Sequence, residues 1–150
     1  MKAPVFLPAC LLCAFLWTPN TQAGLTADNR YVTVNAALAP DTVRSGDTMQ
    51  VLLTFHPAAG IHIAAEPPVS FSPDTAFPGA LAGPISRTVD TASGSLVAAF
   101  PVREAIQVAV GTAPGIHYLR GTVVCFCCSD AEKWCTKFRQ EVSVAFVVTR

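Results

Sequence analysis

Charged side chains are scarce in this chain, and patterns typical of helices are missing from it. Only 13% of its 150 residues are charged, and ten basic residues balance ten acidic ones. A neutral balance of this kind excludes nucleic acid and anionic membrane surfaces as expected partners. No segment keeps the apolar spacing of a helix for three turns, and the 12 prolines oppose helices because each removes a backbone donor. The composition therefore predicts a protein built from strands.

Sequence motifs of hydrolytic enzymes are also missing. No serine lies in a nucleophile elbow, and no two carboxylates share a short motif. The chain has three histidines, His56, His62 and His117. We interpret each of them as a residue at a strand end or in a half-buried position rather than as a catalytic base.

The beginning of the chain has the three-part layout of a secretory signal peptide. Lys2 gives a short basic start, and residues 5–17 form an uncharged apolar run that is too short to cross a bilayer comfortably. Small residues at positions 21 and 23 precede Gly24, as a signal peptidase requires. These features predict that residues 1–23 are removed and that the protein is exported to the periplasm or another extracytoplasmic compartment.

The predicted mature chain, residues 24–150, has the length of one domain, and no run in it is long and apolar enough for a membrane span. Short apolar or alternating segments recur between turn residues, which is typical of an antiparallel β-sandwich or barrel. The predicted fold class is therefore all-β. The expected strands cover residues 31–34, 49–55, 60–63, 69–71, 96–102, 106–110, 116–126 and 142–148.

All four cysteines of the predicted mature chain, Cys125, Cys127, Cys128 and Cys135, lie within one short segment. If the strand that ends at Cys128 pairs with the return strand, Cys128 and Cys135 face each other across the mouth of a hairpin with the loop 129–134. That position suits a disulfide, whose Cα atoms usually lie about 4.4–6.8 Å apart. A bridge that closes so small a loop stabilises a fold only modestly, and this favours a role in exchange.

Exchange requires an accessible sulfur and a thiolate near neutral pH. Lys133 and Lys137 flank Cys135 with positive charge, which favours the thiolate, whereas Asp130 and Glu132 oppose it. The local sequence leaves open which of these two charge effects is larger.

Two other interpretations of the cysteines remain open. Strand alternation places Cys125 and Cys127 on one face and Cys128 on the other. Together with Cys135, these thiols are candidate ligands for a soft metal such as Cu(I) or Zn(II), although their spacing is not a common zinc pattern. Alternatively, they form structural disulfides that staple a binding module without a redox role. Cys125 and Cys127 cannot easily bridge each other across one extended residue, so that alternative requires a crossed pairing.

Two side chains near the cysteines have alternative roles. Trp134 either shields the disulfide from solvent thiols or packs on a neighbouring strand, because aromatic residues favour sheets in any case. Glu66 either approaches the cysteines as a proton acceptor or is a solvated loop carboxylate.

The segment from Cys128 to Cys135 resembles the end of the N-terminal periplasmic domain of the thiol:disulfide interchange protein DsbD and its stand-alone relatives. In that family a strand leads to a cysteine, a short loop of acidic or small residues, a second cysteine and a final strand. Residues 60–63 and 96–102 also fall where the family has comparable strands. The resemblance covers nearly all of residues 30–148, and its specific motif is the cysteine segment.

The resemblance implies an immunoglobulin-like β-sandwich that acts as an electron carrier. Such a domain exchanges reducing equivalents with periplasmic thioredoxin-like proteins through its cysteine pair, which here corresponds to Cys128 and Cys135. Because the sequence contains no predicted transmembrane segment and no thioredoxin-like domain, the implied electron donor is a separate membrane protein. No cofactor is expected.

Overall fold

The computed structural model describes residues 30–150. The predicted signal peptide, residues 1–23, and the cleavage site before Gly24 lie outside the described residues and stay predictions. The described part of the chain contains strands and no helix, so the predicted all-β class is confirmed, and it holds no helix suited to crossing a membrane. The strands are β1 (Val32–Ala39), β2 (Thr42–Arg44), β3 (Thr48–Pro57), β4 (His62–Ile63), β5 (Ser70–Pro73), β6 (Gly79–Leu81), β7 (Val89–Asp90), β8 (Ser95–Leu96), β9 (Val102–Val108), β10 (Gly115–Ser129) and β11 (Trp134–Thr149).

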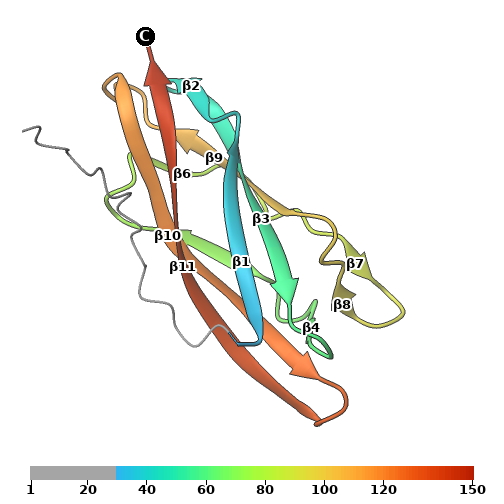
Figure 1. The fold of residues 1–150 in the computed structure, drawn as a ribbon. Helices are drawn as coiled ribbons and strands as arrows, with labels where there is room; N and C mark the ends of the chain where they lie inside the picture. Colours follow the sequence, from blue (N-terminus) through green and yellow to red (C-terminus); the bar gives the residue numbers. More distant parts are fainter. Residues whose placement is uncertain (1–29) are drawn as a thin grey trace, which may run out of the picture.

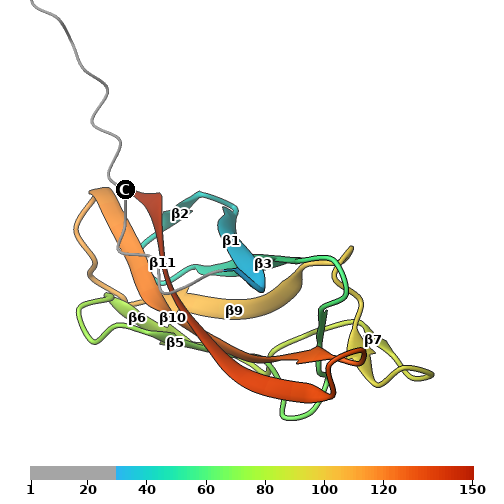
Figure 2. The same cartoon turned by 60° about the horizontal axis from the view of Figure 1, so that its bottom comes forward.

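Two main sheets pack on either side of one core (Figure 1 and Figure 2). One sheet has the strand order β1-β3-β9-β6, and the other has the order β2-β11-β10-β4, with β5 also paired to β10. Every pairing is antiparallel except that of β2 with β11. The small β7–β8 hairpin joins β4 through a bridge between Ala64 and Ser95. The immunoglobulin-like description of this arrangement stays a prediction.

The hairpin of β10 and β11 runs the length of the molecule. The two strands contain 15 and 16 residues, and they pair along all of β10. In Figure 1 the hairpin begins near the C-terminus and ends in a turn at the opposite end of the molecule. Figure 2 shows it curving across the layer that contains β3 and β9. The cysteines, which lie beside the turn, are therefore at the end remote from the C-terminus.

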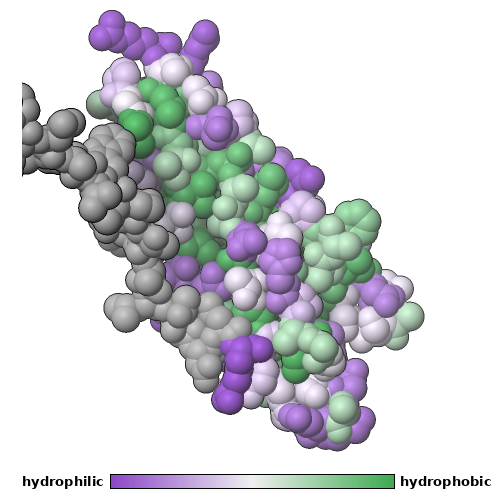
Figure 3. All heavy atoms as spheres, in the orientation of Figure 1, coloured by the Kyte–Doolittle hydropathy of each residue, from purple (hydrophilic) through white to green (hydrophobic). Residues whose placement is uncertain are grey.

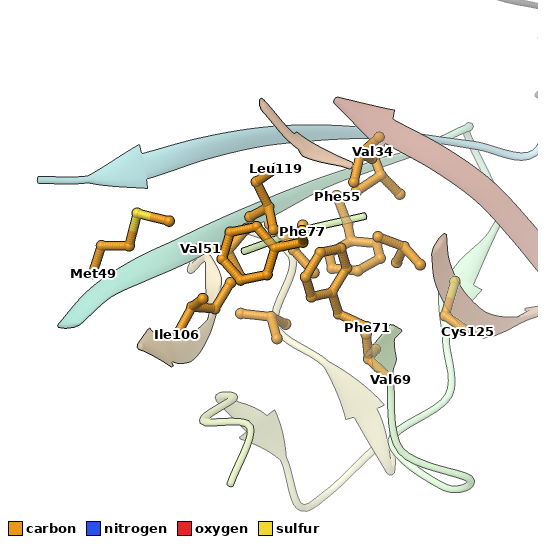
Figure 4. Packing of buried hydrophobic residues seen from close by; sticks show 14 of the residues in the cluster. Val34, Met49, Val51, Phe55, Val69, Phe71, Phe77, Ile106, Leu119 and Cys125 are labelled. Atoms are coloured by element: carbon orange, nitrogen blue, oxygen red, sulfur yellow. The ribbon is translucent and has the colours of Figure 1, made fainter. Parts of the chain in front are cut away.

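Alternation of apolar and more polar residues along the strands produces the core. In β3 every second residue from Met49 to Phe55 is buried, because successive side chains of a strand point to opposite faces. The facing sheet contributes buried residues such as Leu119 and Phe146. Figure 4 shows side chains from both sheets in contact, with Cys125 at the side of the cluster.

Two of the predicted strands have the wrong bounds, since residues 97–101 of the segment 96–102 lie between two strands and the segment 106–110 is strand only at residues 106–108. Leu96 belongs to the two-residue strand β8, and the next strand is β9, which covers the whole gap of residues 103–105 between the two predicted segments. The physical reason is Glu104, which occupies an inward position of β9 and is only 7% exposed. A carboxylate on the apolar face interrupts the alternation by which the strand would have been recognised.

Glu104 is buried without a full set of partners. One of its carboxylate oxygens, Oε2, has no hydrogen-bond partner among the described residues. Burial removes water from the charged form, and this raises the pKa of the Glu104 carboxyl. The folded protein therefore binds a proton at Glu104 over a wider pH range than the unfolded chain does.

Replacing Glu104 with glutamine is expected to stabilise the fold in a pH-dependent way. Stability contributed by a neutral Glu104 is present below the ordinary glutamate pKa of 4.5 and is lost as the pH rises through the raised pKa of the folded state. We expect Glu104→Gln to increase the free energy of unfolding at neutral pH by on the order of 1 kcal/mol. The amide is uncharged, so folding does not bury a charged group at this position. Denaturant unfolding across the pH range measures this, with the exposed Glu141→Gln as the control. Equal pH profiles for Glu104→Gln and the parent protein would contradict it.

Candidate functional site

The candidate site is the disulfide between Cys128 and Cys135 at the end of the β10–β11 hairpin. The register makes these residues direct cross-strand partners, with their Cα atoms 4.1 Å apart. Because directly opposed residues of an antiparallel pair share a face, both sulfurs lie on the same side of the sheet. The disulfide predicted from the sequence is therefore confirmed.

The turn that joins the two strands is shorter than predicted. The expected loop covered residues 129–134, whereas Ser129 and Trp134 pair across the hairpin and leave residues 130–133 in the turn. Lys133 ends the turn in the left-handed region, with a φ of 58°, which a tight hairpin connection requires. The strand pairing thus continues past the disulfide, so the bridge links backbone segments that the sheet already holds together.

The two cysteines differ in exposure. Cys128 is only 5% exposed, whereas Cys135 is exposed. Cys128 lies on β10, which has β4 on one side and β11 on the other. Cys135 lies on β11, which pairs with β2 only near the C-terminus, at Val147 to Thr149. A thiolate from another protein can therefore approach the sulfur of Cys135 more easily than the sulfur of Cys128.

A histidine lies beside the disulfide. In the register of β4 and β10, His62 is the direct partner of Cys128, so His62, Cys128 and Cys135 form a row across three adjacent strands. The Nδ1 atom of His62 is 3.5 Å from a carboxylate oxygen of Asp130 in the turn. Interpreting His62 as a half-buried residue at a strand end was correct about its position but missed its neighbours. No local signal in the sequence pairs β4 with the end of β10, because the two segments are far apart in the chain.

The surface around the disulfide is mainly polar. The turn contains Asp130, Glu132 and Lys133, and Lys137 shares the outer face of β11 with Cys135. On the face shown in Figure 3, hydrophobic residues gather in a band along the long axis, whereas the end with the turn is largely hydrophilic. The exposed apolar pair Ile116 and Val147 lies near the other end of the hairpin.

Trp134 and Glu66 were each given two possible roles, one at the disulfide and one structural. In the structure neither side chain acts at the disulfide. The register places Trp134 on the face opposite to Cys135, where its ring lies 4.9 Å from the ring of Tyr31, and its indole nitrogen donates a hydrogen bond to Glu132. Trp134 therefore packs against Tyr31, which directly precedes β1 of the other sheet, and does not cover the disulfide. Glu66 accepts a hydrogen bond of 2.9 Å from Arg87, with which it forms an ion pair.

Cys125 and Cys127 belong to the core rather than to the disulfide face. Both are free thiols and fully buried on the inward face of β10, and they share one face as strand alternation predicted. A hydrogen bond to Cys127, together with burial, raises the pKa of the Cys125 thiol far above its ordinary range. Cys125 is therefore a neutral thiol at any physiological pH and is a poor nucleophile.

The alternative arrangements of the four cysteines do not match this geometry. A second disulfide is absent, since Cys125 and Cys127 are both free in the described chain. The four sulfurs also fail to converge as metal ligands, because two of them face the core and two form a disulfide on the outer face. Among residues 30–150, no group of three or more histidine, cysteine, aspartate or glutamate side chains is arranged to hold a metal ion.

Comparison of the chain with family models, with curated proteins and with solved structures found no match. The arguments for its function therefore come from the disulfide and the side chains around it.

Protein purified in air is expected to retain far less than one equivalent of copper or zinc after dialysis against a chelator. A tight site would require at least three converging ligands, and the four thiols lie on two faces of β10 and β11. Metal analysis by mass spectrometry, with and without prior reduction of the disulfide, measures this. One equivalent of metal that survives the chelator in the oxidised protein would contradict it.

Proposed function

We propose that this protein is a thiol–disulfide exchange carrier in which Cys128 and Cys135 are the redox couple. A partner thiolate attacks the sulfur of Cys135, a mixed disulfide forms, and Cys128 leaves as a thiolate. The second thiolate of the partner then attacks its own sulfur in the mixed disulfide and releases Cys135 as a thiolate. The partner dithiol is oxidised to a disulfide, and the carrier gains two electrons.

The observation that carries this proposal is an exposed cysteine, Cys135, in a bond that adds little to the fold. Cys128 and Cys135 are seven residues apart and are already direct partners in the sheet. In the loop-entropy model so short a loop contributes near the low end of the typical range of about 2–4 kcal/mol. An exposed bridge with a small structural contribution is the kind that exchange chemistry uses.

The partners follow from the proposed chemistry and from the resemblance to the N-terminal domain of DsbD. We infer that the carrier is exported, that it exchanges with thioredoxin-like proteins of the periplasm, and that a separate membrane protein reduces it. The hydrophilic end of the hairpin offers Cys135 at a surface that a partner can approach. No cofactor takes part, because both electrons are held by the cysteine pair.

Reduction by a small dithiol tests the proposal. The oxidised protein is mixed with dithiothreitol at neutral pH, quenched with an alkylating reagent and analysed by mass spectrometry of the peptide that contains Cys128 and Cys135. We expect rapid, complete reduction of the folded protein and reoxidation by a thioredoxin-like disulfide. A bridge that reacts only after the protein is unfolded by denaturant would assign it to a disulfide-stapled binding module and overturn the carrier proposal.

A further inference from the structure

The strand β4 presents one residue to the core and the other to the disulfide. Ile63, the partner of the core residue Cys127, is 1% exposed. His62 is the partner of Cys128, and because adjacent residues of a strand point to opposite faces, its ring lies on the face that carries the disulfide. Directly opposed residues of an antiparallel pair have Cβ atoms about 4.5–5.5 Å apart, so a ring on this position reaches its partner. The amide of Ala64 donates a 2.9 Å hydrogen bond to the carbonyl of Phe126 and continues the alignment of the two strands.

The turn fixes which nitrogen of the ring is available. The Nδ1 atom of His62 lies 3.5 Å from the Asp130 carboxylate, whose side chain is 88% exposed, whereas the His62 side chain is 30% exposed. A carboxylate only accepts hydrogen bonds, so this contact favours the hydrogen on Nδ1. The nitrogen left for other chemistry is therefore Nε2.

Of the two cysteines, the buried Cys128 forms a thiolate less easily. When the disulfide is attacked at Cys135, the leaving group is Cys128, which is only 5% exposed. Burial in protein disfavours a thiolate, since water no longer solvates its charge. Cys135 is exposed, and water can solvate its thiolate. Because of this difference in exposure, a nearby proton donor or positive charge would help Cys128 more than Cys135. His62 lies on the side of Cys128.

We propose that His62 is the acid–base residue for the Cys128 sulfur and that Asp130 is a positioning residue for the ring, an inference that rests on the proposed exchange function. In the reductive direction the Cys128–Cys135 bond breaks, and the leaving Cys128 thiolate takes the proton from Nε2 of the protonated ring. The ring is left neutral, with its Nδ1 hydrogen directed at Asp130. In the reverse direction the neutral ring removes the proton from the Cys128 thiol, and the thiolate attacks the mixed disulfide on Cys135 and expels the partner thiolate.

Other charged groups near β4 do not fill this role. The neighbouring strand β8 supplies Ser95 and Leu96, which carry no charge, and Glu66 beyond β4 is paired with Arg87. Glu132 accepts a hydrogen bond from Trp134, on the opposite face of the hairpin. His62 is thus the described ionisable side chain that the strand register places directly beside Cys128.

The test compares exchange rates at neutral pH for the parent protein, His62→Ala, His62→Gln and Asp130→Asn, with His56→Ala as the matched control. His56 is exposed on the other sheet, where it contacts Asn35. We expect both His62 variants to slow reduction by dithiothreitol by about 100-fold, the lower end of what acid–base groups contribute. Asp130→Asn is expected to slow it less, and His56→Ala is expected to change it less than about twofold.

A second readout separates chemistry from structure. The pH profile of the exchange rate should lose one step in both His62 variants and keep it in His56→Ala, because an acid–base group that takes part in the reaction shapes that profile. His62→Gln keeps a side chain of similar size that transfers no proton. If His62→Ala fails to fold, His62→Gln still tests the role of the ring. The role of His62 is wrong if the parent protein exchanges and His62→Gln exchanges within about twofold of it. It is also wrong if His62→Gln is slower but keeps the pH profile of the parent protein. If the parent protein does not exchange at all, it is the proposed function that fails.

Discussion

Replacing Cys128 with serine is expected to trap a covalent complex with a thioredoxin-like partner, whereas replacing Cys135 with serine abolishes exchange. In Cys128→Ser the exposed Cys135 thiol can still attack a partner disulfide, but the residue that would resolve the mixed disulfide is missing. In Cys135→Ser the remaining thiol, Cys128, is 5% exposed and cannot be reached by the partner. The two variants should therefore behave oppositely.

The experiment uses a partner whose second cysteine has been replaced and whose remaining cysteine is held as a mixed disulfide with thionitrobenzoate. Attack by a carrier thiol then expels the small thiolate, and the complex is scored by gel electrophoresis without reductant. Complex formation by Cys128→Ser and its absence for Cys135→Ser is the expected result. Both variants should remain folded and lose no more than about 2–3 kcal/mol of unfolding free energy, because the closed loop is short. Equal trapping by both variants would contradict the assigned order of attack, and unfolding of either would show that the bridge is structural.

Replacing both core cysteines with alanine is expected to lower the stability of the fold and to leave exchange unchanged. The variant Cys125→Ala/Cys127→Ala removes two fully buried sulfurs and leaves a cavity beside the core, so its unfolding free energy should fall by roughly 1–3 kcal/mol. Exchange through Cys128 and Cys135 should be unchanged, because the substituted residues lie on the other face of β10. Denaturant unfolding and the dithiothreitol reaction measure the two effects on the same sample. Loss of exchange in the folded double variant would bring the core thiols into the chemistry and contradict the separation of the two faces.

Strands in which apolar and polar residues alternate regularly could be predicted from the sequence. The predicted segment 49–55 lies within β3, and the segments 116–126 and 142–148 lie within β10 and β11. The same period placed Cys125 and Cys127 on one face and Cys128 on the other, and the structure shows that the first of these faces is the core face. It failed at β9, where Glu104 breaks the apolar face. Two-residue strands such as β7 are held by pairing with distant parts of the chain and have no periodicity to detect.

The candidate site was predictable where it is local in sequence. Cys128 and Cys135 are joined by one tight turn, so their approach follows from the chain itself. The position of His62 follows instead from the pairing of β4 with β10, between segments about 65 residues apart, and no pattern in either segment encodes that pairing. The predicted turn, residues 129–134, was two residues too long, because Ser129 and Trp134 pair across the hairpin. This pairing decides on which side of the hairpin Trp134 lies.

The most direct test of the central claim is the equilibrium of the Cys128–Cys135 bond with a redox buffer. The folded protein is incubated in a series of glutathione and dithiothreitol buffers, and the alkylated peptide is quantified at each potential. A carrier should pass from oxidised to reduced at a potential above roughly −300 mV, below which structural disulfides of secreted proteins typically lie. A bond that stays oxidised in the folded protein down to that potential and beyond would contradict the account.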